Sequence, residues 1–177
     1  MNEPSTSPRM LGIYLNDHAA GATGGAELAR RTAREHRQSA FGGDLEDIAA
    51  QIMEDREALL DIMADLEVPV RRYKLCAGWL GEKAGRLKPN GRLRHRSGLS
   101  TLVELEGLRI GVEGKAMLWH SLLGAADQDT RLDPDRLAEL LNRARRQRTV
   151  LESLHQAAAA ALFAPGRPEA QETVVGP

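Results

Sequence analysis

The stretch Leu45–Leu66, LEDIAAQIMEDREALLDIMADL, decides the fold. Its apolar residues return every three or four positions, which is the period of an α-helix with one buried face. Most of the charged residues between them fall on the opposite side of the helical wheel. The stretch therefore predicts an amphipathic helix with a buried stripe of Leu45, Ile48, Ile52, Leu59, Met63 and Leu66.

Three other segments show the same helical period. The helix around Leu45–Leu66 is expected to begin with Asp44 as its N-cap, and the last helix to begin at Pro134 behind the capping residue Asp133. The third segment has a wide apolar arc that includes Ile110 and Met117. The sequence thus predicts four long helices, at about 9–38, 44–67, 100–124 and 134–163.

The links between these helices indicate the topology. Short links join the first helix to the second and the third to the fourth, whereas residues 68–100 form a long crossover with room for a shorter helix at about 71–87. This is the connectivity of ferritin-like bundles. We therefore expect an all-α, ferritin-like four-helix bundle over residues 9–163, with a short extra helix in the crossover. Residues 1–8 and 164–177 are rich in Pro, Gly and small polar residues and are expected to be disordered tails.

Composition excludes several classes of protein. The single cysteine, Cys76, excludes an internal disulfide framework and a cysteine-based zinc site. No apolar run is long enough to span a membrane. The first residues lack the charged segment followed by an apolar segment that marks a signal peptide, so a cytoplasmic location is expected. The net charge of −1 does not indicate any particular class of binding partner.

Four short motifs resemble an uncharacterised bacterial family of ferritin-like four-helix bundle proteins. They are Tyr14–His18, Met53–Glu57, Val103–Gly107 and Gly114-Lys115, and the resemblance covers roughly residues 10–163. The ferritin-like superfamily implies a di-iron site with two Glu-x-x-His motifs, of which this chain has one clear match, Glu152–His155.

Polar residues on the predicted core faces allow two interpretations. The favoured one is a buried network in which Glu106 and Glu113 are clamped by Arg56, Arg109 and Arg148. Neighbouring guanidinium groups of this kind would repel a metal ion. The alternative is an iron or other transition-metal site formed by His18, Glu106, Glu113, Glu152 and His155. The whole predicted core network is His18, Arg56, Glu106, Arg109, Glu113, Arg148 and His155, with His120 beside it.

Basic residues are concentrated in the crossover. Residues 71–96 carry a charge of about +8, which predicts a patch able to bind nucleic acid or an acidic partner, or to drive homo-oligomer formation through salt-sensitive attraction. Three functions follow: a non-enzymatic scaffold or interaction protein, which is favoured; a metal-dependent oxidase or iron-handling protein; and a nucleic-acid or acidic-partner binder. The basic patch comprises Arg71, Arg72, Lys74, Arg92, Arg94 and Arg96.

Overall fold

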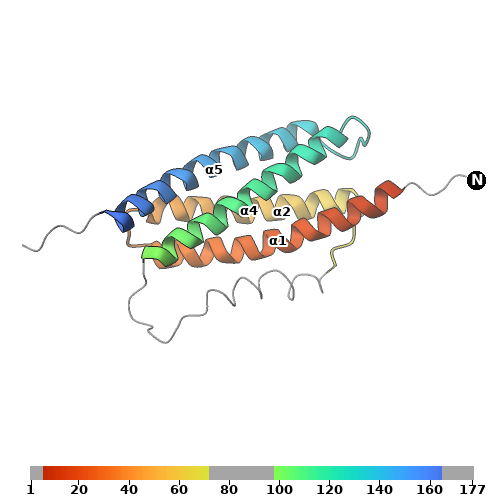
Figure 1. Ribbon diagram of the computed structural model, residues 1–177. Helices are drawn as coiled ribbons and strands as arrows, with labels where there is room; N and C mark the ends of the chain where they lie inside the picture. The colour runs from red at the N-terminus through yellow and green to blue at the C-terminus, as the bar shows by residue number, and fades with distance from the viewer. Residues whose placement is uncertain (1–5, 72–97, 165–177) are drawn as a thin grey trace, which may run out of the picture.

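The computed structural model describes residues 6–71 and 98–164. Within these two ranges the chain consists of four α-helices and no strand, as the sequence predicts (Figure 1). Within the same ranges, none of the helices combines the length and the apolar character that crossing a membrane requires. The helices are α1 (Thr6–His36), α2 (Gly42–Asp65), α4 (Gly98–Ala125) and α5 (Pro134–Phe163).

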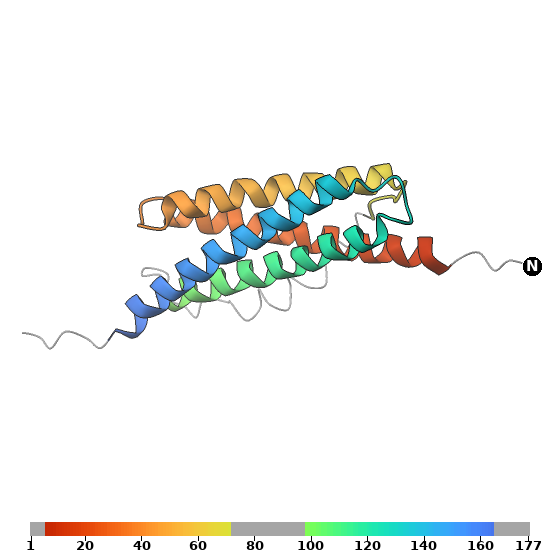
Figure 2. The same cartoon turned by 90° about the horizontal axis from the view of Figure 1, so that it is seen from above.

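The helices form two antiparallel hairpins that pack on each other. One hairpin is α1 with α2, and the other is α4 with α5 (Figures 1 and 2). Between the hairpins α1 lies along α4, whereas α2 and α5 approach each other over only a short stretch. The contact between the hairpins is therefore uneven, and the wider side lies between α2 and α5.

The core follows the apolar period of the sequence. All six residues of the predicted α2 stripe are buried, which confirms that prediction. On α4 the expected apolar arc is too wide, because Ile110 and Met117 are 54% and 56% exposed. The largest fully buried side chains come from all four helices and include Leu15, Leu59, Leu105, Trp119 and Leu151.

Helix ends depart from the prediction at α2. Asp133 caps α5 as expected, because its Oδ1 accepts from the backbone N–H groups of Asp135 and Arg136 at 2.9 and 3.1 Å. However, Asp44 is not the N-cap of α2, which begins at Gly42 without a side-chain cap. A Cβ at position 42 would lie 2.6 Å from the carbonyl oxygen of Arg37, so the tight turn after α1 requires a glycine there.

Two boundary predictions also change, and two other predictions lie outside the described residues. Helix α1 begins at Thr6, so residues 6–8 belong to the helix and not to the expected tail. Helix α4 begins at Gly98, two residues before the expected start. The shorter helix expected at about 71–87 and the C-terminal tail after residue 164 lie outside the described residues.

Candidate functional site

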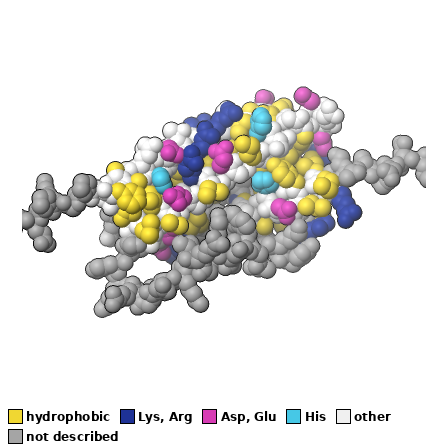
Figure 3. All heavy atoms as spheres, viewed as in Figure 1, with side chains coloured by type: hydrophobic (Ala, Val, Ile, Leu, Met, Phe, Trp, Pro, Cys, Tyr) yellow, Lys and Arg dark blue, Asp and Glu magenta, His cyan; other side chains and the backbone are white. Residues whose placement is uncertain are grey.

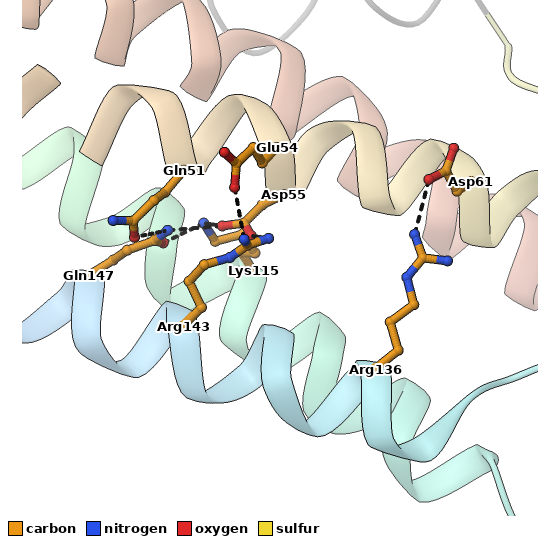
Figure 4. A network of polar contacts seen from close by, with 8 residues as sticks. All are labelled: Gln51, Glu54, Asp55, Asp61, Lys115, Arg136, Arg143 and Gln147. Carbon is orange, nitrogen blue, oxygen red and sulfur yellow. Dashed lines mark hydrogen bonds and ion pairs between the residues drawn. The ribbon is translucent and has the colours of Figure 1, made fainter. Parts of the chain in front are cut away.

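A polar cluster inside the bundle joins three helices (Figure 4). Asp55 comes from α2, Lys115 from α4, and Arg143 and Gln147 from α5. The side chains of Asp55 and Lys115 are 1% and 14% exposed, and that of Arg143 is 25% exposed. Gln147 is also buried, at 1%. We call these four residues the core cluster.

The Asp55 carboxylate is the centre of the core cluster. Its Oδ2 accepts from Lys115 Nζ and, at 3.0 Å, from Gln147 Nε2. Its Oδ1 lies 2.5 Å from Nη2 of Arg143 as an ion pair. The same arginine donates from Nη1 to Glu54 at the rim of the bundle, over 2.9 Å. Both oxygens of Asp55 therefore face cations held by the other hairpin.

Gln147 connects the members of the core cluster. Its Oε1 accepts from Lys115 Nζ at 2.6 Å, and its Nε2 donates both to Asp55 and to Gln51 Oε1, the latter at 3.2 Å. A buried amide that uses its acceptor and its donors in this way leaves little unmet hydrogen-bonding capacity. The amide thus fixes the positions of Lys115 and Asp55 relative to each other.

Burial sets the electrostatics of Lys115. Desolvation lowers the pKa of its ammonium from 10.5, the charge and hydrogen bond of Asp55 oppose that effect, and the positive charge of Arg143 reinforces it. The two cations are balanced by Asp55 and by Glu54 at the rim. The groups of the core cluster are directed at one another, which is the arrangement of a structural ion-pair network.

The sequence contains a signal for this cluster that the helical wheel of the predicted stripes does not capture. Three members of the core cluster each lie three positions after one buried apolar residue and four positions before the next. This is the spacing of a core position on a helix. The helical wheel assigned Arg56 and Arg148 to the core, each one residue away from the side chain that is buried there, and Lys115 entered only as part of a family motif. The flanked residues are Asp55 between Ile52 and Leu59, Lys115 between Val112 and Trp119, and Gln147 between Ala144 and Leu151.

Arg56 does not reach the carboxylates that it was expected to clamp. Its Nε donates to Thr23 on α1 at 3.3 Å, and its Nη1 pairs with Glu57, the next residue along α2. The expected clamp of Glu106 and Glu113 by Arg56 is therefore wrong. The physical reason is that Asp55 and Arg56 are adjacent on α2, so their side chains point about 100° apart around the helix. Of the two, Asp55 points toward α4 and α5.

Five of the other predicted network residues, together with Glu152, form a ladder of ion pairs on the surface. Three pairs cross from α4 to α5 and step in opposite directions along the two antiparallel helices. Their side chains are 27–51% exposed, so the expected burial of this network is wrong. We call them the surface ladder: Glu106 with His155 at 3.1 Å, Arg109 with Glu152 at 2.5 Å, and Glu113 with Arg148 at 3.2 Å.

His18 lies apart from the surface ladder. Its ring packs edge-on against Tyr14, with centroids 4.6 Å apart, and burial lowers its pKa below 6.5 despite the neighbouring charge of Asp17. Among the residues that the structure describes, no three His, Cys, Asp or Glu side chains gather into a group that could hold a metal ion. Of the five described residues predicted to bind a metal in the alternative interpretation, only Glu106 and His155 pair with each other.

A shallow hollow of about 550 Å³ lies against α5 beside the core cluster. Its lining includes Ala58 of α2 and three arginines of α5, Arg136, Arg143 and Arg146. Arg136 pairs with Asp61 across the gap at 3.0 Å, as Arg143 pairs with Glu54 (Figure 4). These exposed pairs join α2 to α5 where the two backbones are farther apart.

The basic patch is described at one residue only. Arg71 is exposed, and its backbone N–H donates to Asn16 Oδ1 at 2.7 Å. Arg72, Lys74, Arg92, Arg94 and Arg96 lie outside the described residues. Comparisons of the chain with protein-family models, with curated proteins and with solved structures found no match.

Proposed function

We propose that this protein is a non-enzymatic interaction protein that binds another protein through the exposed face of α4. The observation that carries the proposal is the apolar character of that face. Four of the eight large apolar side chains that are exposed in the described ranges lie on α4, with exposures of 37–56%. They are Leu99, Val103, Ile110 and Met117, and we call them the α4 ridge.

The α4 ridge lies opposite the buried face of the same helix. Leu108, Val112 and Trp119 point into the core, whereas the α4 ridge points away from it. Figure 3 looks onto this side of the bundle and shows hydrophobic side chains at several places among the charged ones. Exposed apolar side chains that line one face of a helix and are bordered by polar groups can form a protein–protein contact.

The polar groups of the bundle support a structural role better than a catalytic one. The members of the core cluster bond to one another, and each acid of the surface ladder has a base beside it. The ferritin-like family, the iron site and the nucleic-acid function stay predictions. Two arginines stand against the iron site, because Arg109 and Arg148 hold two of its carboxylates, Glu152 and Glu113.

The test is site-specific photo-crosslinking in the cells that make the protein. A benzophenone amino acid replaces Ile110 in one variant and Met53 in the control, where Met53 is 42% exposed on α2, away from the α4 ridge. We expect a protein adduct of defined mass from position 110 and none from position 53. No adduct from position 110, or the same adducts from both positions, would refute the proposal.

A further inference from the structure

We propose that the bundle opens along the line between α2 and α5, which we call the seam, while α1 and α4 stay packed together as the hinge. In this opening the two hairpins swing apart, and each keeps its own internal packing. The inference goes beyond the proposed function, because none of the groups that carry it belongs to the α4 ridge. Its basis is the contact between α1 and α4, the polar chemistry of the seam and the hollow beside the seam.

The side of the bundle between α1 and α4 is held along most of α1. Contacts cross from α1 to α4 at three levels: Tyr14 with Ser121 at 3.4 Å, Leu28 beside Gly107, and Arg31 with Glu104 at 3.6 Å. In the middle, a Cβ added at Gly107 would lie only 3.3 Å from Leu28, so the two backbones approach closely there. Separating the hairpins on this side would expose apolar surface along the length of the contact, and that cost grows with the exposed area.

Polar pairs join α2 to α5 across the seam. They cross at three levels, all drawn in Figure 4: Arg136 with Asp61 at 3.0 Å, Arg143 with Glu54 at 2.9 Å, and Gln147 with Gln51 at 3.2 Å. Water can replace each of these bonds when the helices part, so their net contribution to the closed state is small. Exposed ion pairs likewise contribute little. The seam is therefore the weaker of the two contacts between the hairpins, which agrees with the short stretch over which α2 and α5 approach each other.

The core cluster does not lock the seam as an apolar core would. Asp55 on α2 is buried against Lys115 and Arg143 of the other hairpin. Burying these charges carries a desolvation cost that offsets much of their attraction. When the seam opens, water reaches all three groups together and this cost is recovered. Opening thus differs from a substitution of Asp55, which leaves the two cations buried without a partner.

The hollow of about 550 Å³ marks the place where the seam can widen first. Its lining includes Ala58 of α2 and Leu140 of α5, which are 8% and 4% exposed. The same lining includes Arg136 and Arg143, the two arginines whose ion pairs cross the seam. A small increase in the separation of α2 and α5 therefore gives a small reagent access to position 58.

Thiol labelling of the purified full-length chain tests the direction of opening. In a background with Cys76→Ser, Ala58→Cys places a thiol at the seam and Thr32→Cys places one at the hinge. Thr32 is completely buried, and the residues one turn before and after it, Leu28 and His36, both contact α4. Each variant is treated with N-ethylmaleimide, an uncharged reagent, and the adduct is followed by mass spectrometry. We expect Ala58→Cys to react faster than Thr32→Cys.

Salt separates opening of the seam from unfolding of the whole chain. Raising sodium chloride from about 0.01 to about 1 M shortens the screening length from about 30 to about 3 Å and weakens the exposed pairs of the seam. We expect the labelling rate of Ala58→Cys to rise by up to about tenfold and that of Thr32→Cys to stay constant, with the circular dichroism unchanged. Equal rates for the two variants, or a rate at position 58 that does not depend on salt, would overturn the inference.

A matched pair of charge variants gives the independent measurement. Arg136→Gln removes an ion pair that crosses the seam, whereas Arg30→Gln removes an exposed ion pair with Glu27 inside α1. At low salt we expect Arg136→Gln to speed the labelling of Ala58→Cys by about threefold and Arg30→Gln to leave it unchanged. Equal effects of the two substitutions, or no effect of Arg136→Gln, would show that the pairs across the seam do not hold it closed and would overturn the inference.

Discussion

Replacing Asp55 by asparagine is the most direct perturbation of the core cluster. The substitution keeps the size of the side chain and removes the negative charge that faces Lys115 and Arg143. Breaking a buried ion pair from one side costs about 3–5 kcal/mol, because the remaining charge is left buried without a partner. The whole free energy of unfolding of such a domain is about 5–15 kcal/mol, so this loss is large.

The matched control is Glu113→Gln, which makes the same change of charge beside an arginine on the surface. Glu113 and Arg148 are 39% and 45% exposed, and exposed pairs contribute about 0–1 kcal/mol. Both variants are measured by urea denaturation, followed by far-ultraviolet circular dichroism. Equal losses of unfolding free energy in the two variants would refute the distinction between the buried cluster and the surface ladder.

The dependence on pH provides a second measurement for the same variant. Because burial lowers the pKa of Lys115 below 10.5, the unfolded chain binds more protons between the two pKa values, and stability from this group rises with pH in that range. Asp55→Asn removes the group that opposes this lowering, so the rise should begin at a lower pH and be larger than in the native sequence. A variant whose stability is independent of pH below 10.5 would contradict the assignment.

Three further predictions concern helix ends and the surface. Gly111→Ala should stabilise the protein by up to about 1 kcal/mol in thermal unfolding, because its Cβ meets open space, whereas Gly42→Ala should destabilise it, because its Cβ would meet the Arg37 carbonyl oxygen at 2.6 Å. Asp133→Ala should cost about 1 kcal/mol in the same assay through the loss of the α5 cap, and an unchanged melting temperature would argue against that role. The hydrogen bonds from Arg131 lower the pKa of Asp129 to about 2, so its carboxyl should titrate near that value by nuclear magnetic resonance and return toward 3.8 in Arg131→Gln.

The sequence predicted the helices well because their buried stripes are long and regular. Every residue of the expected α2 stripe is buried, and Asp133 caps α5 as its position before Pro134 indicates. On α4 the period was ambiguous, because apolar residues lie on two opposite faces. Ile110 and Met117 were therefore assigned to the core, although they are exposed.

The polar groups were harder to place because a helical wheel resolves direction only coarsely. Neighbouring residues differ by about 100°, so Asp55 and Arg56 both border the stripe, and only packing decides which one is buried. The long side chain of Lys115 on α4 reaches Asp55 on α2, which lies 60 residues earlier in the sequence. No local sequence pattern encodes that contact. The pairing of α4 with α5 in the surface ladder likewise depends on the register of two helices.

The position of the core cluster has a consequence for the order of folding. Each hairpin is made of neighbouring helices with a short turn, and such local contacts form early because little chain entropy is lost in closing them. The bonds between Asp55 and its partners on α4 and α5 require the hairpins to be docked in one register. We therefore expect loss of Asp55 to accelerate unfolding and to leave the refolding rate nearly unchanged, so that the cluster determines how long the docked state lasts.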